Sequence, residues 1–180
     1  MEIIKNFKPK CIQEENDKKI MLEFLSNNSN AYTRDNEIAH MTASSWIVNK
    51  DHTKVLMVYH NIYNSWSWTG GHMDGELDYL KVAIKEASEE TGINSFKVLN
   101  NGEIYSLEIL PVFAHFKRGK FVSGHLHFNV TYLLESDELD SLHIKDDENS
   151  GVKWFYINNV LDSVNEEEMK KTYQKLIERL

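Results

Sequence analysis

Three glutamates, Glu86, Glu89 and Glu90, lie close together in an amphipathic segment that ends at Gly92. The C-terminal end of a helix carries a partial negative charge, so carboxylates are unfavourable there unless a cation compensates them. On a helical wheel Glu90 lies about 75° from the centre of the apolar face, Glu86 about 115° away, and Glu89 nearly opposite. Glu86 and Glu90 therefore lie one turn apart at the edge of the buried face. A hard divalent cation such as Mg²⁺ would relieve their repulsion.

Two glycines, Gly70 and Gly71, precede this segment and allow the backbone to approach an ion or a phosphate closely. A solvated acidic helix face behind a flexible loop is the alternative. A second acidic run, residues 166–168, falls at the start of a predicted helix, where the dipole favours it and no chemistry is needed. Residue types alone leave both interpretations of the first cluster open.

The glutamates must be presented by a helix, because apolar side chains recur at spacings of three and four across the same segment. These are Leu80, Ala83, Ile84, Ala87 and Thr91. Asp78 is the expected N-cap, Gly92 the expected C-terminal stop, and Leu77 is expected to pack against Val82 as a hydrophobic staple.

Runs rich in β-branched and aromatic residues predict the strands around this helix. They occupy residues 41–49, 54–60, 103–116, 121–135 and 152–157. The first two form a hairpin, and a tight turn at 117–120 joins the two long ones. A closing helix, capped by Ser163 and Glu166, is expected to present an apolar face made of Met169, Tyr173, Leu176, Ile177 and Leu180. The fold class is α+β, an α/β/α sandwich around a mixed sheet, with residues 1–35 as an N-terminal helical appendage and 36–180 as the main domain.

Composition excludes several classes of protein. A formal net charge of −8 argues against binding to duplex nucleic acid, which requires a basic face. The N-terminus lacks the apolar core of a signal peptide, and no apolar run approaches the ~20 residues of a membrane span. The single cysteine, Cys11, excludes an intramolecular disulfide and fits a reducing compartment. A cytoplasmic protein without membrane contact is expected.

The stretch from Gly71 to Ile93 resembles the Nudix box: a glycine, five residues, a glutamate, seven residues, then Arg-Glu-aliphatic-any-Glu-Glu-any-Gly-aliphatic. Here it ends in KEASEETGI, at residues 85–93. The upstream WSWTGG resembles the family's Trp-any-aliphatic-Pro-Gly-Gly. The chain departs from the box at Leu77, where the first glutamate is usual, and at Lys85, where arginine is usual. Lys85 is expected to pair with Glu76 or Asp78 across the loop, as a point charge rather than a bidentate fork.

The resemblance implies a Nudix-type α/β/α sandwich and hydrolysis of a nucleoside diphosphate linked to another group. It places Mg²⁺ or Mn²⁺ on Glu86 and Glu90, completed by the Gly71 carbonyl, with Glu89 holding a further ion or its water shell. Glu86 is alternatively a general base, and the two roles stay open. Lys85 belongs to the same catalytic set, and Glu148 in a late acidic loop is an additional metal ligand.

Histidines and aromatic residues are candidates for substrate contacts. His125 and His127 lie two apart on a predicted strand and so project to one face. Together with His72 they are expected to line the substrate cleft. Plain surface packing and a zinc site that includes His72 or His40 are the alternatives. Trp66 is expected to stack on a nucleobase, with Trp68 and Tyr63 as further candidates; core packing is the alternative for Trp68.

Two other functions fit the same scaffold. A catalytically weak or inactive nucleotide-binding sensor is suggested by the departures at Leu77 and Lys85. Diphosphate isomerase chemistry needs a cysteine near the site, whereas Cys11 lies in the appendage. Homodimers are common in the family that the chain resembles, so a homodimer is an expected option.

Overall fold

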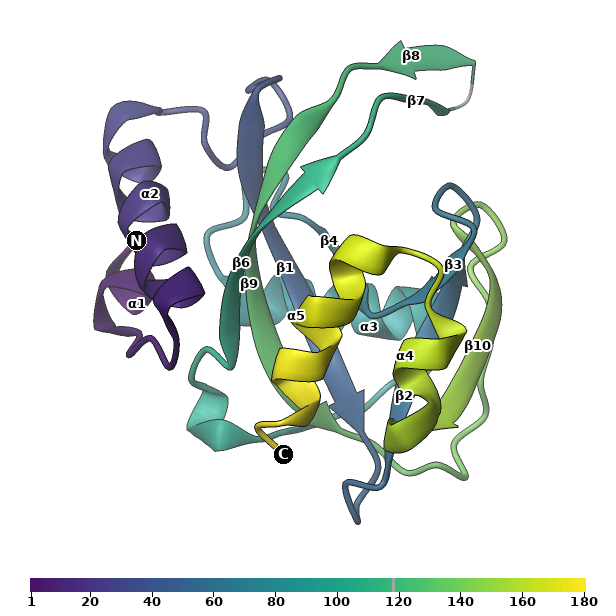
Figure 1. The fold of residues 1–180 in the computed structure, drawn as a ribbon. Helices are drawn as coiled ribbons and strands as arrows, with labels where there is room; N and C mark the ends of the chain where they lie inside the picture. The colour runs from purple at the N-terminus through teal and green to yellow at the C-terminus, as the bar shows by residue number, and fades with distance from the viewer. Residues whose placement is uncertain (118) are drawn as a thin grey trace.

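The computed structural model describes residues 1–117 and 119–180, and eight strands of this part of the chain form one mixed sheet (Figure 1). They are β1 (Ala39–Val48), β2 (Lys54–His60), β3 (Ser65–Ser67), β4 (Thr69–His72), β5 (Lys97–Val98), β6 (Ser106–Val112), β9 (His125–Glu135) and β10 (Asn149–Tyr156). The main path runs β10-β2-β1-β9-β5, while β3 pairs with β2, β4 with β1 and β6 with β9. The central pair, β1 and β9, is parallel.

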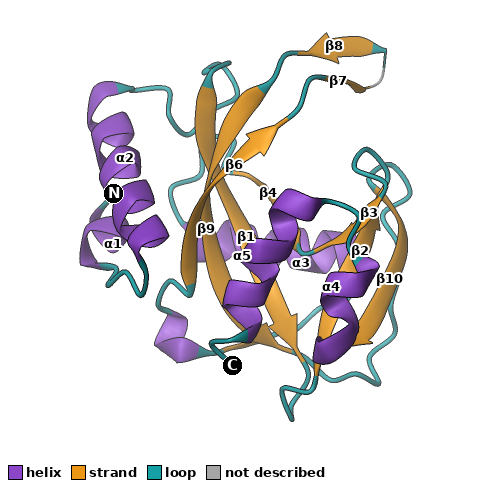
Figure 2. Cartoon of the chain, in the orientation of Figure 1, coloured by secondary structure: helices purple, strands orange, loops and turns teal. Residues whose placement is uncertain are grey.

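Helices cover both faces of this sheet (Figure 2). They are α1 (Glu2–Asn6), α2 (Ile12–Asn27), α3 (Tyr79–Thr91), α4 (Val160–Ser163) and α5 (Glu167–Ile177), with short 3₁₀ turns η1 (Asn100–Gly102) and η2 (Ile157–Asn159). Every residue of β1 is buried, as expected for a central strand with both faces covered. Within the described residues, every helix is too short or too polar to span a lipid bilayer.

The two faces of β1 belong to different clusters of apolar side chains. Met41 and Ala43 pack with Val82 and Ala83 of α3. On the other face, Trp46 packs with the apolar side of α5, which includes Met169, Tyr173 and Leu176. The expected α/β/α sandwich is therefore confirmed. The predicted apolar face of the closing helix is confirmed for Met169, Tyr173 and Leu176, whereas Leu180 lies beyond the end of α5 and is 37% exposed. The predicted cap is wrong, because Ser163 belongs to α4 and the Glu166 side chain makes no cap hydrogen bond.

The N-terminal helices pack on the outer part of the sheet. Met21 and Leu25 of α2 join the same cluster as Phe128 of β9, and Phe24 contacts the Phe128 ring edge-to-face at 4.7 Å. In the first turn of α2, Glu14 is fully buried. Its carboxylate lies 2.6 Å from the guanidinium of Arg179, just beyond α5, and 3.7 Å from Lys175 of α5. Polar and apolar contacts thus tie α2 to both the sheet and the C-terminal helix.

The caps predicted for α3 are confirmed. The Asp78 carboxylate accepts from the Lys81 amide at 3.1 Å, and Gly92 ends the helix in the left-handed region at φ 79°. The predicted staple is wrong, because Leu77 is 67% exposed. The preceding loop is held by polar bonds instead, since Glu76 accepts from the amides of Leu77 at 2.8 Å and Asp78 at 3.2 Å.

The predicted strands are found, and the two long ones are each interrupted. β1 and β2 form the expected antiparallel hairpin, with Ile47 opposite Leu56. The other hairpin divides into β6 and β9 within the sheet and a separate pair, β7 (His115–Lys117) with β8 (Lys120–Val122), that projects beyond it (Figure 1). The turn predicted at 117–120 includes Arg118, which lies outside the described residues.

Candidate active site

A cleft of about 620 Å³ opens where β1, β4, β9, α3 and the segment 145–148 meet. Carboxylates line one part of its wall and imidazoles another. The carboxylates include Glu86, Glu89, Glu90 and Glu148, and the imidazoles include His40, His72, His125 and His127.

Glu90 lies at the deep end of the carboxylate wall and is 4% exposed. The main-chain amide of Gly70 donates to its Oε1 at 2.9 Å. Pairing of β4 with β1, which sets Gly70 opposite Ser44, fixes this amide. Burial raises the pKa of Glu90 to about 8, and the Gly70 hydrogen bond only partly offsets the effect. A nearly buried carboxylate of this kind is costly to ionise unless a cation accompanies it.

Glu86 lies against Gly71, in the space that a side chain at position 71 would enter. A Cβ at position 71 would lie 2.5 Å from the Glu86 carboxyl carbon and 2.8 Å from Oε2. Because glycine has no side chain, the Glu86 carboxylate can lie directly against the backbone of β4 at Gly71. Backbone and carboxylate oxygens are the donors that a hard divalent cation prefers, so the two residues fit such an ion.

Two lysines compensate the negative charge on this wall. Lys85 Nζ lies 3.0 Å from carboxylate oxygens of both Glu86 and Glu89. Lys145 Nζ lies 3.1 Å from Glu89 and 2.9 Å from Glu148. The hydrogen bonds from Lys85 and Lys145 lower the pKa of Glu89. These ammonium groups stabilise the acidic end of the helix.

The expected partners of Lys85 differ from those in the structure. Asp78 caps α3, and Glu76 pairs with Lys81 rather than with Lys85. Glu76 also accepts hydrogen bonds from the amides of Leu77 and Asp78. It therefore stabilises the loop at Leu77, the position where the Nudix box normally has glutamate. Lys85 therefore acts on the carboxylate wall and not on the loop.

The exposure of the three glutamates follows the order of the wheel angles. Glu90 is 4% exposed, while the side chains of Glu86 and Glu89 are 13% and 40% exposed. Hydrogen bonds and ion pairs hold all three toward the cleft wall. Among residues 1–117 and 119–180, these three carboxylates do not form a group close enough to enclose one ion together. Mg²⁺ needs only one or two carboxylates, since substrate phosphates and water complete its shell.

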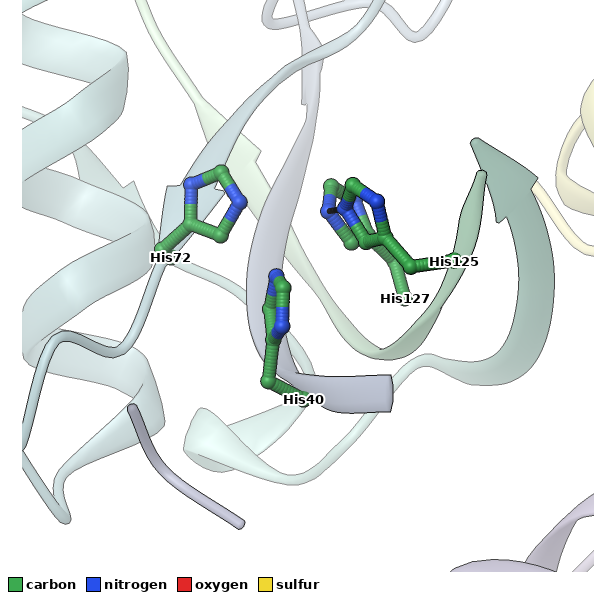
Figure 3. Close-up of side chains that lie close together, drawn as sticks. All are labelled: His40, His72, His125 and His127. Atoms are coloured by element: carbon green, nitrogen blue, oxygen red, sulfur yellow. Dashed lines mark hydrogen bonds between the residues drawn. The ribbon is translucent and has the colours of Figure 1, made fainter. Parts of the chain in front are cut away.

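The imidazoles form a compact group of their own (Figure 3). His40 comes from β1, His72 from β4, and His125 and His127 from β9. Their ligand nitrogens all lie within 4.8 Å of one another. Burial lowers the pKa of His127 to about 2, with neighbouring histidines as the next cause, so its ring is neutral at physiological pH.

The aromatic candidates divide between the cleft and the core. Trp68 and Tyr63 line the cleft, whereas Trp66 is absent from its wall. The Trp66 ring packs edge-to-face on Phe155 at 4.8 Å and on Tyr59 at 5.3 Å. The structure therefore gives Trp66 a packing role apart from the cleft.

Two basic residues on the cleft wall, Arg34 and Lys145, were not indicated by the sequence. Arg34 reaches the cleft from the polar segment before β1 and forms a bidentate pair with Asp74. Lys145 comes from the late acidic loop. No local motif marks either residue, because tertiary packing alone brings them to the carboxylates. Both offer positive charge to an anionic ligand.

Residues 39–180 match the NUDIX domain. A comparison with curated proteins finds no match.

Similar solved structures include a C. elegans Ap4A hydrolase, with TM-score 0.55 and 19% identity over 75% of this chain and 93% of that one. A NUDIX-family hydrolase from Clostridium perfringens has TM-score 0.52 and 22% identity over 78% and 97% of the two chains. The E. coli dihydroneopterin triphosphate pyrophosphohydrolase has TM-score 0.58 and 13% identity over 78% and 96%. At these identities the likeness describes the fold.

Proposed function

Since the chain belongs to the NUDIX domain family and is a Nudix hydrolase, we propose that it hydrolyses a pyrophosphate linkage in a nucleoside diphosphate linked to another group. Mg²⁺ or Mn²⁺ is the proposed cofactor. The main support for this proposal is the contact between β4, which contains Gly70 and Gly71, and α3, which carries the three glutamates. Gly70 bonds to Glu90, and Glu86 occupies the space beside Gly71 that a side chain would fill.

We assign the metal ligands to this contact. Glu86, Glu90 and the Gly71 carbonyl would hold the ion, while Glu89 and Glu148 would serve a second ion or its water shell. Such an ion would neutralise pyrophosphate oxygens and lower the pKa of the attacking water. The alternative role proposed for Glu86 is that of the general base that accepts a proton from that water. Lys85, bonded to Glu86 and Glu89, fixes the orientation of both carboxylates.

Substrate recognition is assigned to the remaining cleft walls. Arg34 and Lys145 supply positive charge for phosphate groups, as expected for recognition of a phosphorylated ligand. Trp68 and Tyr63 offer ring surfaces for a base. His72, His125 and His127 form the wall beyond the carboxylates. Two of the similar structures are named for Ap4A hydrolysis and for pyrophosphate hydrolysis of a triphosphate, which supports a small nucleotide-type substrate.

We also infer a division of the chain at residue 36. The NUDIX match begins at 39, after α1 and α2, so residues 1–35 are proposed as a helical appendage to the domain at 36–180. Met21 and Leu25 pack into the same cluster as Phe128. Removal of the appendage would expose this apolar surface, so a protein lacking residues 1–35 should be less soluble than the full chain.

The function is tested with a panel of dinucleotides, nucleotide sugars and nucleoside triphosphates in Mg²⁺ or Mn²⁺. Wild-type protein should cleave at least one class of substrate, and Glu90→Gln should lose that cleavage while keeping the circular dichroism spectrum. Tight nucleotide binding without turnover in both proteins would refute the proposal and support a nucleotide sensor.

A further inference from the structure

Sheet register brings four histidines from three strands to one place. His40 of β1 lies directly opposite His127 of the parallel strand β9. His125 is two residues before His127 and so projects to the same face. On the other side of β1, His72 of β4 pairs with Thr42, two residues beyond His40. The pairing of these strands therefore brings the four imidazoles together (Figure 3).

Backbone carbonyls orient two of these rings. His40 Nδ1 lies 3.0 Å from the Asn36 carbonyl oxygen, and His125 Nδ1 lies 2.9 Å from that of Ser123. Because a carbonyl oxygen only accepts, each Nδ1 carries the proton and each Nε2 keeps its lone pair. A carbonyl that accepts from Nδ1–H is the usual outer partner of a histidine bound to a metal.

One of these lone pairs is buried without a partner. His40 is 4% exposed, and its Nε2 has no hydrogen-bond partner among the described residues. A buried polar atom left in this state destabilises the fold. His40 Nε2 belongs to the group of ligand nitrogens within 4.8 Å of one another, so an ion within that group would satisfy it.

The spacing of the nitrogens fits a tetrahedral transition-metal ion. Zn–N bonds of about 2.0–2.1 Å in a tetrahedron require nitrogens about 3.3 Å apart. Nε2 of His125 and Nε2 of His127 are 3.2 Å apart, and small side-chain rotations would bring the others within this distance. The ring centroid of His40 lies 4.9 Å from those of His72 and His125 and 5.1 Å from that of His127.

We propose that His40, His72, His125 and His127 bind one Zn²⁺ ion as a four-nitrogen site distinct from the carboxylate site. Imidazole suits Zn²⁺ and related transition metals, whereas Mg²⁺ requires oxygen ligands that this group does not provide. Four protein ligands complete the tetrahedral shell, so the ion is structural and electrostatic in role.

The proposed ion links the parts of the fold that carry the carboxylate wall. His72 directly follows Gly70 and Gly71 on β4, while the other three ligands belong to the central strands β1 and β9. The ion would hold β4 against the sheet beside Gly71. It would also add two positive charges to a cleft that binds an anionic substrate. The site can be tested without any measurement of hydrolysis.

The test begins with full-length protein stripped by a chelator and titrated with Zn²⁺ by calorimetry. One Zn²⁺ per chain should bind with submicromolar affinity in the presence of millimolar Mg²⁺, and Co²⁺ should give the visible bands of a tetrahedral complex. Zn²⁺ should also raise the melting temperature. Absence of stoichiometric uptake, or an octahedral Co²⁺ spectrum, would overturn the proposal.

Variants separate the histidine site from the carboxylates. His40→Gln and His127→Gln should each weaken Zn²⁺ binding at least tenfold and abolish the tetrahedral Co²⁺ spectrum. His125→Gln, at a partly exposed position, repeats the test if His40→Gln or His127→Gln misfolds. Two controls should bind Zn²⁺ as wild type: His52→Asn, in an exposed turn, and Glu86→Gln/Glu90→Gln. If the carboxylate variant loses Zn²⁺ while the histidine variants retain it, the ion binds to the glutamates and the histidine site does not exist.

Discussion

The main-chain amide of Gly70 and the carboxylate of Glu90, twenty residues apart, are joined by a 2.9 Å hydrogen bond. This bond ties β4 to the last turn of α3, where the helix dipole disfavours negative charge. Glu90 is nearly buried at this point, and burial raises its pKa to about 8. Carboxylates are tolerated at this end of the helix because the Gly70 amide, Lys85 and Lys145 form hydrogen bonds and ion pairs with them.

Gly71→Ala should disturb Glu86 more than it disturbs the fold. The added Cβ would lie 2.5 Å from the Glu86 carboxyl carbon, so the side chain must move away from the strand. Displacement of a catalytic group by about 1 Å costs roughly 100-fold in rate, and kcat should fall by about tenfold to hundredfold. Steady-state kinetics on the best substrate of the panel would measure this.

Gly124→Ala is the matched control for that substitution. A Cβ at position 124 has its nearest contact at 3.4 Å, which is ordinary packing. Its kcat should stay within about twofold of wild type. Equal losses in the two variants would contradict a specific role for the space beside Gly71.

Lys85→Gln should raise the pKa of Glu89. The hydrogen bond from Lys85 is the largest cause that lowers this pKa, and Lys145 supplies only part of the remaining effect. NMR titration of selectively labelled glutamate carboxyls would report the change as a shift of the Glu89 midpoint to higher pH. Lys81→Gln is the control, because Lys81 pairs with Glu76 and should change the Glu76 midpoint alone. An unchanged Glu89 midpoint in Lys85→Gln would show that the ion pair does not form in solution.

Glu14→Gln should destabilise the whole chain. Glu14 is fully buried, with Arg179 Nη1 at 2.6 Å and Ser106 Oγ at 2.9 Å. Loss of one charge of a buried pair costs about 3–5 kcal/mol, and urea unfolding at pH 7 should show a loss near the lower figure because Gln keeps an acceptor. Glu15→Gln, at an exposed position of the same helix, should change stability by less than about 0.5 kcal/mol.

The contribution of Glu14 to the free energy of unfolding should depend on pH. Burial acts to raise the pKa of Glu14, but hydrogen bonds from Arg179, Lys10 and Ser106 outweigh it and lower the folded-state value below 4.5. The stability that Glu14 contributes is therefore fully present above pH 4.5 and is lost as the pH falls through the folded-state pKa. The difference between wild type and Glu14→Gln should narrow from pH 6 to pH 3. A constant difference would contradict the assigned charge state.

Local signals in the sequence predict the helix that carries the glutamates. Asp78 and Gly92 cap α3 as expected, and the wheel angles give the order in which Glu90, Glu86 and Glu89 are exposed. These features depend on neighbours within one or two turns. The staple at Leu77 fails because Glu76, the adjacent residue, satisfies the backbone amides of the loop and leaves Leu77 in solvent.

Contacts across the sheet could not be predicted from the sequence. His125 and His127 share a face by alternation alone, but His40 joins them only because β1 and β9 pair in parallel with His40 opposite His127. No local pattern sets that register, since the two strands are far apart in the sequence. For the same reason Lys145 next to Glu89 was not expected. Trp66 was expected to stack on a nucleobase, yet its ring packs on Phe155 rather than in the cleft.

Titration of Mn²⁺ followed by electron paramagnetic resonance tests the assignment of the carboxylate wall most directly. Wild-type protein should bind Mn²⁺, and Glu86→Gln/Glu90→Gln should lose that binding by at least tenfold. The control Glu167→Gln/Glu168→Gln removes two carboxylates from the start of α5, where they complement the helix dipole, and should bind Mn²⁺ as wild type does. Equal Mn²⁺ affinity in wild type and Glu86→Gln/Glu90→Gln would contradict the assignment of the metal to these two residues.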